Sequence, residues 1–444
     1  MSYTGPLRSP EHRYRSWGRY PTAPPAEVLT VAWRSDVPRL DRLVGSVLPY
    51  AWGRSYGDSC LNQDGTLLDV RGLDRLIAFD PDSGVLRCEA GVTLAEILAL
   101  IVPRRWFLPV LPGTRWVSVG GAIANDIHGK NHHRAGTFGR HVTRLELVRS
   151  SGERIVCGPT DALFQATVGG LGLTGVITWA EIQLARVAGA GIAVEEIRFS
   201  GLDQFFALSA EDQQFEYTVA WVDCLARGQR LGRGIYMRGD HVALDGPLPS
   251  PLEAARITVP FDAPGGLLNR VTLSLFNAAY YRRQMSTRRR RVVPYVPFFF
   301  PLDGVGDWSR LYGSRGFLQY QCVVPDLQGG DAIRSIFERI AGSGEAASLA
   351  VLKRFGAARS PGMLSFPREG ITLAVDFAVR GPRTFALLDD LDALVRSAGG
   401  AVYPAKDARM SPESFRAFFP ELERFRPHRD PRFSSSFWRR VNAA

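Results

Sequence analysis

Cysteine is scarce in this chain, and its few occurrences are dispersed. The 444 residues include Cys60, Cys88, Cys157, Cys224 and Cys322, none of which belongs to a C-x-x-C pair. An odd, scattered set of this kind argues against a disulfide framework and against a zinc site. We therefore expect reduced thiols that act mostly as small buried hydrophobic residues, and we expect no metal site.

Long hydrophobic runs are also missing. No window of 18 or more apolar residues occurs, so no membrane-spanning helix is expected. The first 20 residues are polar and rich in arginine, and they lack the apolar segment of a secretory signal. A cytoplasmic location is the default expectation, with peripheral contact at a membrane, or at its periplasmic face, as the alternative.

Acidic residues are fewer than basic ones, 44 against 54, which leaves a net charge of +10. This balance suits an anionic ligand, an anionic lipid surface or nucleic acid, but no zinc-finger spacing or RNP-type motif supports nucleic acid. One cluster, which precedes an apolar run, contains Arg282, Arg283, Arg288, Arg289, Arg290 and Arg291. The cluster is either a solvated surface loop or a basic loop that meets a membrane or a phosphorylated lipid.

Glycine, in contrast, is abundant, and six glycines fall within residues 111–141. Glycine lets the backbone approach a ligand closely, and successive bare N–H groups form concave sites for phosphate oxygens. A polar cluster follows within the same stretch: Asp126, His128, Lys130, Asn131, His132 and His133. The stretch predicts backbone wrapped around a large cofactor with polar groups beside it, although glycine-rich turns alone fit ordinary structure equally well. His132 and His133 are expected to satisfy local structure.

Hydrophobic periodicity predicts mixed strands and helices, which favours an α+β fold over a doubly wound sheet. In the first part we expect strands at 28–33, 67–70, 75–79, 85–90, 141–149, 153–157 and 176–184, and helices at 38–47, 93–102 and 161–167. A Gly/Ala-rich boundary follows at 187–192. Beyond it we expect strands at 217–224, 316–324, 348–355 and 370–379, helices at 331–341, 384–398 and 411–426, and a mobile, loop-rich flap at 264–301.

Three glycine-rich motifs carry a resemblance to a known family. These are GRSYGDS at 53–59, PGTRWVSVGGAIANDIHGKNHH at 112–133 and ATVGGLGLTGVI at 166–177. With them the chain resembles the FAD-linked oxidases of the vanillyl-alcohol-oxidase type. FLQYQCVVP at 317–325, YPAKDAR at 403–409 and DPRF at 430–433 make it most similar to the subfamily of decaprenylphosphoryl-ribose 2′-oxidases.

The resemblance implies a bipartite FAD-binding domain of the PCMH type, formed by residues 1–187 and 400–444. A substrate domain at 188–399, an antiparallel sheet covered by helices, is implied between them. The implied FAD contacts are Gly53, Arg54, Ser55, Tyr56, Gly57, Asp58, Ser59, Gly113, Ser118, Val119, Gly120, Gly121, Asn125, Asp126, Ile127, His128, Ile177 and Tyr403. Many relatives bind flavin covalently through a histidine in the first motif. GRSYG has no histidine, so we expect non-covalent FAD.

The resemblance also implies a substrate and a catalytic centre. The substrate is a polyprenyl-phosphate ribose whose 2′-hydroxyl is oxidised, and a separate NAD(P)H-dependent keto-reductase completes an epimerisation. Lys406, His128 and Lys130 are the implied catalytic residues. Gln319, Gln321 and Lys353, together with Lys130 and Lys406, are expected to contact substrate; the two glutamines lie two apart on one strand and so share a face. Lys406 could be a base, if burial or the charge of Lys130 and Lys353 lowers its pKa, or it could stay charged and stabilise developing negative charge.

The chain departs from the subfamily pattern at three positions. Ala374 stands where the pattern has a cysteine, Thr372 where it has an asparagine, and Phe299 where it has a tyrosine. The predicted pocket is therefore more apolar, and inhibitors that capture that thiol should fail. Two other functions remain open: a soluble sugar, alditol or aldonolactone oxidase that uses oxygen, and a non-catalytic flavin-binding partner.

Overall fold

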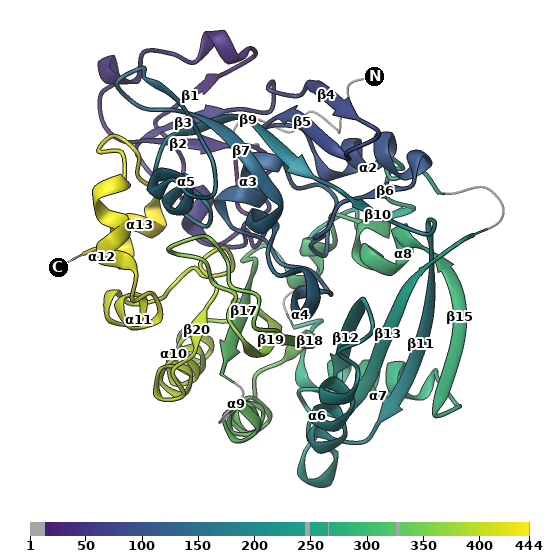
Figure 1. Ribbon diagram of the computed structural model, residues 1–444. Coiled ribbons are helices and arrows are strands. Elements are labelled where there is room, and N and C mark those ends of the chain that lie inside the picture. The colour runs from purple at the N-terminus through teal and green to yellow at the C-terminus, as the bar shows by residue number, and fades with distance from the viewer. Residues whose placement is uncertain (1–13, 245–248, 265, 326–328, 444) are drawn as a thin grey trace.

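The computed structural model describes residues 14–244, 249–264, 266–325 and 329–443 (Figure 1). The arginine-rich N-terminal stretch up to residue 13 lies outside the described residues. Helices and antiparallel sheets are mixed along the chain, which confirms the predicted α+β class. All five cysteines are free, and four of them are buried. Over the described part of the chain, no helix combines the length and apolar character that crossing a bilayer would need.

The N-terminal part contains two larger sheets and the two-stranded pair of β6 (Trp106–Phe107) with β10 (Ala185–Arg186). A three-stranded parallel sheet has the order β1-β3-β2, from β1 (Glu27–Thr30), β2 (Val47–Tyr50) and β3 (Thr66–Asp69). An antiparallel sheet has the order β4-β5-β9-β7-β8, from β4 (Leu76–Asp80), β5 (Val85–Glu89), β7 (Val142–Val148), β8 (Arg154–Cys157) and β9 (Val176–Gln183). The strands predicted at 141–149 and 153–157 are confirmed as β7 and β8, which pair as an antiparallel hairpin.

The helices of this part include α2 (Leu94–Ile101), α3 (Val119–Ala124), α4 (His132–Ala135) and α5 (Ala162–Thr167). Helix α2, predicted at 93–102, begins with a capping box. The Thr93 side chain accepts from the Glu96 amide at 3.2 Å, and the Glu96 carboxylate accepts from the Thr93 amide at 2.8 Å. This reciprocal capping fixes the start of the helix, whose apolar face enters the core beside the glycine-rich stretch.

An eight-stranded antiparallel sheet dominates the middle of the chain, in the order β15-β11-β13-β12-β18-β19-β17-β20. Its strands are β11 (Gly191–Phe199), β12 (Tyr217–Val222), β13 (Gly234–Val242), β15 (Arg288–Pro294), β17 (Phe317–Val324), β18 (Ala347–Phe355), β19 (Gly370–Ala378) and β20 (Ala401–Val402). Helices α6 (Leu202–Glu211), α9 (Gly329–Ser343) and α10 (Pro382–Ser397) lie on one side of it (Figure 1). Alternate side chains such as Leu318, Tyr320 and Leu352 join the core with these helices. The other face is left for the cavity described below.

Three sequence expectations are wrong. Residues 38–47 form only one turn of 3-10 helix (Leu40–Arg42), because Gly45 takes a φ of +83° and Val47 then begins β2. The 264–301 segment is not a loop-rich flap: it holds α7 (Arg270–Arg282), β15 and α8 (Tyr295–Phe299). Helix 411–426 is divided into α11 (Pro412–Phe418) and α12 (Leu422–Phe425), because Pro420 cannot continue a helix.

The arginine cluster is likewise not a loop. Arg288–Arg291 begin β15, which pairs with β11 at the edge of the large sheet. Arg290 contacts Glu195 at 2.9 Å and Arg291 contacts Glu196 at 2.6 Å across that pair. Opposite charges facing each other on neighbouring strands stabilise the pairing, which explains why so basic a segment is ordered as a strand.

The C-terminal segment connects the two halves of the molecule. It starts as β20 beside β17, and its later residues reach β2, where the Val47 amide donates to Arg432 O at 2.9 Å. Helix α13 (Ser436–Val441) then carries Arg440 to a pair of buried carboxylates, Asp58 at 2.7 Å and Asp407 at 2.9 Å. The proposed division at 187 and 399 stays a prediction, but this segment clearly contacts both sides of it.

Replacing the shared guanidinium should destabilise the protein. In Arg440→Met, Asp58 and Asp407 lose their buried counter-ion, and we expect the free energy of unfolding to fall by about 3 kcal/mol. Arg424→Met is the matched control, since Arg424 and Glu421 form an exposed pair and the loss should stay below about 1 kcal/mol. Urea denaturation of both variants measures the difference. Equal losses would contradict the importance assigned to the buried cluster.

Candidate active site

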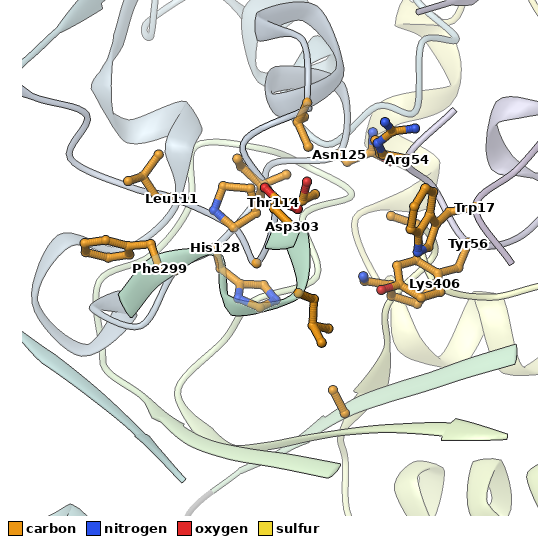
Figure 2. Close-up of a pocket in the computed structure, with 18 of the residues that line it drawn as sticks. Trp17, Arg54, Tyr56, Leu111, Thr114, Asn125, His128, Phe299, Asp303 and Lys406 are labelled. Carbon is orange, nitrogen blue, oxygen red and sulfur yellow. The ribbon is translucent and has the colours of Figure 1, made fainter. Parts of the chain in front are cut away.

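One continuous cavity of about 870 Å³ lies between the glycine-rich loops and the large sheet. Its volume falls in the range of protein sites that enclose small molecules and cofactors. Figure 2 shows His128 on one side of the space, and Trp17, Tyr56 and Lys406 together on the other. Residues far apart in the sequence therefore meet at a single site.

The glycine-rich motifs form one wall. Fourteen of the predicted FAD contacts line the cavity: Gly53, Arg54, Ser55, Tyr56, Ser59, Gly113, Ser118, Gly120, Gly121, Asn125, Ile127, His128, Ile177 and Tyr403. Their assignment to the cofactor stays a prediction. Local bonds hold this wall in place: the Ser118 hydroxyl caps α3 by accepting from the Gly121 amide at 3.1 Å, and the Tyr403 hydroxyl donates to Asn125 O at 2.7 Å.

Two features of this wall fit a polar cofactor. The Ser59 hydroxyl is buried at the cavity and has no hydrogen-bond partner among the residues that the structure describes. A buried polar group of this kind is expected to bond something, and here the cavity offers the space. A side chain added at Gly113 would meet no atom within 4 Å, so the backbone there is bare toward the cavity. Both features suit a ligand with phosphate and ribose oxygens.

Four predicted FAD contacts do not line the cavity: Gly57, Asp58, Val119 and Asp126. The Asp58 carboxylate is turned to Arg440, and Val119 is fully buried in the core. The Asp126 carboxylate accepts from the Gly139 amide at 2.8 Å and from the hydroxyls of Ser360 and Ser365. The side chains of Asp58, Val119 and Asp126 therefore point into the protein interior and support the loops from behind the cavity wall.

Gly57 lies where the first motif meets the segment that carries Lys406. A Cβ at this position would lie 1.7 Å from the carbonyl oxygen of Asp407. The neighbouring Tyr56 amide donates to Ala405 O at 2.8 Å. The first motif and the segment that carries Lys406 are thus in backbone contact, and Gly57 is required for that close approach.

The large sheet forms the opposite wall and carries three of the five predicted substrate residues. Gln319 and Gln321 on β17 and Lys353 on β18 line the cavity, as do Lys130 and Lys406. The alternation expected for β17 is seen, since its intervening residues join the helix-covered core. Ala374 on β19 also faces the cavity and leaves no thiol there. Assignment of these residues to substrate stays a prediction.

Lys406 has an environment suited to proton transfer. Burial lowers the pKa of its amine, the Asp376 carboxylate raises it, and Lys353 lowers it further, to about 7. The amine lies 3.6 Å from the centre of the Tyr56 ring. Burial likewise raises the pKa of Asp376, which accepts from Gln319 at 2.6 Å and from the Tyr312 hydroxyl at 3.0 Å. A base with a pKa near neutrality is well matched to proton abstraction.

His128 is held as a neutral ring. The Thr372 hydroxyl donates its proton to Cys322 O, so its oxygen accepts a hydrogen bond from the Gln321 amide nitrogen. That amide nitrogen also lies 2.8 Å from His128 Nε2. On the other side of the ring, the Lys353 amine lies 3.3 Å from His128 Nδ1. Burial, followed by Lys353, lowers the pKa of His128 well below its usual value. Burial also lowers the pKa of Lys353, to about 8.

Lys130, His132 and His133 differ in how their side chains are held. The Lys130 amine donates to the carbonyls of Phe298, at 2.6 Å, and Phe299, at 3.3 Å, and burial with Lys353 lowers its pKa to about 7. The positive charge that acts on Lys406 is that of Lys353. His133 satisfies local structure by bonding Phe215 O at 2.8 Å. His132 packs on Phe355 instead, and neither of its ring nitrogens finds a partner among the described residues.

Asp376 is the main site residue that sequence reasoning missed. It lies in a strand two residues after Ala374, where the alternating pattern marks it as sharing that residue's face. The signal was therefore present, since a carboxylate on the cavity face of a strand demands a partner. Its pairing with Gln319 depends on the β17–β19 register, which the sequence alone does not contain.

Comparisons with known proteins agree with this geometry. Residues 36–158 match the family described as FAD binding domain. A decaprenylphosphoryl-beta-D-ribose oxidase of Mycolicibacterium smegmatis is 38% identical to the chain, with 97% of each protein covered. The chain belongs to the decaprenylphosphoryl-β-D-ribose oxidase family. A Streptomyces coelicolor protein without an assigned function is 37% identical over 79% of the chain, and a human Delta(24)-sterol reductase is 32% identical over 24% of it.

This membership confirms the family resemblance drawn from the motifs, and it establishes FAD as the cofactor. The glycine-rich wall is the part of the cavity suited to hold it, given its bare backbone at Gly113 and the unpartnered Ser59 hydroxyl. When bound, FAD supplies the two-electron acceptor that oxidation of an alcohol requires. The protein contributes binding, orientation and the placement of proton-transfer groups.

We predict that FAD is bound without a covalent link. Residues 53–57 of the first motif contain no histidine, so the usual histidyl bond has no donor there. Acid denaturation followed by washing should therefore release all of the yellow colour into the supernatant. Colour that stays with the precipitated polypeptide, and a peptide mass raised by that of FAD, would contradict this prediction.

Proposed function

We propose that this protein oxidises the 2′-hydroxyl of a polyprenylphosphoryl-β-D-ribose to the 2′-keto sugar. This is the first half of an epimerisation that yields an arabinose donor for cell-envelope polysaccharide. Full-length similarity to a decaprenylphosphoryl-beta-D-ribose oxidase supports the substrate class. The observation that carries the chemistry is the position of the Lys406 amine, in the wall of the cavity that the glycine-rich motifs line and 3.6 Å from the centre of the Tyr56 ring.

Four residues that line the cavity have separate roles in this reaction. Lys406 in its neutral form accepts the proton of the sugar hydroxyl, and Asp376 across the site stabilises the ammonium that results. His128, fixed by Gln321, offers a neutral ring that positions the sugar by hydrogen bonding. Lys353 places positive charge beside both groups and so favours the neutral form of Lys406 and the build-up of negative charge on the substrate oxygen.

The proposal includes partners and a location. A 2′-keto sugar must be reduced from the opposite face to complete the inversion, so a separate NAD(P)H-dependent keto-reductase is the expected partner. A lipid-linked substrate implies a cytoplasmic protein in peripheral contact with a membrane, or one at its periplasmic face. Helix α7 supports such contact, since Val271, Leu275 and Phe276 are 68%, 67% and 54% exposed beside the basic residues of β15.

Anaerobic mixing of the FAD-loaded protein with farnesylphosphoryl-β-D-ribose tests the proposal. We expect the visible absorption band of the flavin to bleach and a 2′-keto product to form. A soluble sugar, alditol or aldonolactone oxidase would instead turn over free sugars and release hydrogen peroxide in air. Bleaching by free sugars but not by the lipid-linked ribose would replace the proposed function with that alternative.

A further inference from the structure

The floor of the cavity is one face of the large sheet, and its polarity changes across the strands. Cross-strand partners Trp221, Val351, Ala374 and Gln321 form a continuous row over β12, β18, β19 and β17. All four residues line the cavity. The row begins at the indole of Trp221 and ends at the side-chain amide of Gln321, so the cavity floor has an apolar region and a polar region.

The region over β17, β19 and the Lys353 end of β18 is polar, and it is the one occupied by the proposed catalytic residues. The region over β12, β13, β11, β15 and the Leu349 and Val351 positions of β18 is apolar and has no part in that chemistry. We call this second region the apolar arm; its lining residues are Val194, Val219, Trp221, Met237, Val293, Leu349 and Val351. The apolar arm is continuous with the polar region in a single cavity.

Among the residues that the structure describes, the charged groups that line the far end of the cavity are arranged so that they do not oppose an apolar ligand. Glu196 lines the cavity beside the apolar arm, but Arg291 pairs with it at 2.6 Å. Arg283 is stacked on the Tyr280 ring at 3.7 Å and donates to its hydroxyl at 2.7 Å. Neutralised and stacked in this way, these groups mark an opening rather than a second polar site.

Helix α7 borders this opening. Its Tyr280 ring lies 4.6 Å from the Trp221 ring and 6.0 Å from that of Phe276. Tyr281 bonds Phe199 O of β11, which fixes the helix beside the sheet (Figure 1). Phe276 and Tyr280 line the cavity, whereas Val271 and Leu275 of the same helix are exposed to solvent. The apolar arm therefore ends at the most exposed apolar surface of the helix.

From this arrangement we infer that the apolar arm binds the first isoprene units of the substrate's lipid chain, which then leaves the protein beside α7. The inference rests on the proposed function and names the part of the site that recognises the lipid. An extended chain of methyl-branched units matches a trough of valine, methionine and leucine with an aromatic end, and each buried methylene adds to affinity. The sugar then occupies the polar region, where the lysines lie.

Comparison of a tailed and a tailless substrate tests the inference. We expect the wild-type kcat/KM for farnesylphosphoryl ribose to exceed that for ribose 1-phosphate by at least tenfold, mainly through KM. Equal kcat/KM values would overturn the inference and leave the proposed function standing. Failure of both substrates to bleach the flavin would instead overturn the proposed function.

A substitution that fills the apolar arm provides a second test. Val219→Phe adds bulk to the trough, and we expect it to lower the ratio of the two kcat/KM values by tenfold or more. Val156→Phe, on the exposed side of β8, is the control and should leave the ratio as in wild type. An unaltered ratio in Val219→Phe would contradict the assignment.

Direct binding of farnesyl phosphate is measured by calorimetry on the FAD-loaded protein, and it does not depend on turnover. The affinity should fall about tenfold in Met237→Gln, which keeps the shape of the side chain but places an amide in the apolar arm. Melting curves and FAD content identify any variant that has not folded. Wild-type affinity for farnesyl phosphate in folded Met237→Gln would overturn the inference even if the protein oxidised no sugar.

Discussion

Lys406→Met is expected to reduce the rate of flavin bleaching by about 10³-fold, because it removes the group that accepts the hydroxyl proton. Methionine keeps much of the length and apolar stem of the lysine but has no basic nitrogen. FAD should stay bound, since the glycine-rich wall is unchanged. Stopped-flow absorbance under anaerobic conditions measures the rate, and the flavin spectrum measures occupancy. Bleaching at the wild-type rate would remove Lys406 from the mechanism.

The pH dependence separates a base from a fixed positive charge. With a pKa of about 7, Lys406 is protonated below that pH, so the bleaching rate should rise as pH increases through about 7 and then level off. Asp376→Asn removes the carboxylate that raises this pKa, and the rising limb should move to lower pH. A rate that falls above pH 7 would show that the ammonium, not the amine, is the active form.

Gly57→Ala is expected to have the second-largest effect, although Gly57 does not line the cavity. The new Cβ would lie 1.7 Å from Asp407 O, so the segment carrying Tyr403 and Lys406 must separate from the first motif. A displacement of about 1 Å at a reacting group can cost about 10²-fold in rate. We expect a loss of that size in kcat/KM, together with weaker retention of FAD.

A second glycine-to-alanine change controls for the substitution itself. Gly342 lies in α9, and a Cβ there would meet no atom within 4 Å. Gly342→Ala should keep wild-type activity and gain slightly in stability, because alanine is the better helix former. Comparable FAD content and activity in Gly57→Ala and Gly342→Ala would contradict the proposed contact between the two segments.

Much of the site could be predicted because its residues lie in short sequence motifs that can be recognised without the fold. The first motif, the 112–133 stretch and Lys406 each sit in short, distinctive sequences, and all three reach one cavity. The start of α2 can also be recognised in the sequence, since the side chains of Thr93 and Glu96 each accept a hydrogen bond from the other residue's backbone amide. Gln319 and Gln321 share a face through strand periodicity alone.

Other features depend on contacts between distant residues. Residues 288–291 look like a solvated basic loop until Glu195 and Glu196 of β11 are placed opposite them. Strand β11 itself was missed because its start follows a Gly/Ala-rich segment that resembles a linker. The apolar arm joins side chains from β11, β12, β13, β15 and β18, whose common face exists only once the strand order is known. Asp376 gains its role from the same register.

The most direct test of the central claim is a single-turnover measurement with a labelled substrate. FAD-loaded protein is mixed anaerobically with farnesylphosphoryl-β-D-ribose that carries either hydrogen or deuterium at C2 of the sugar, and flavin absorbance is followed. Oxidation at the 2′-hydroxyl predicts complete bleaching that is several-fold slower with deuterium. No bleaching, or bleaching at the same rate with both substrates under conditions where the bond-breaking step limits the rate, would contradict the account.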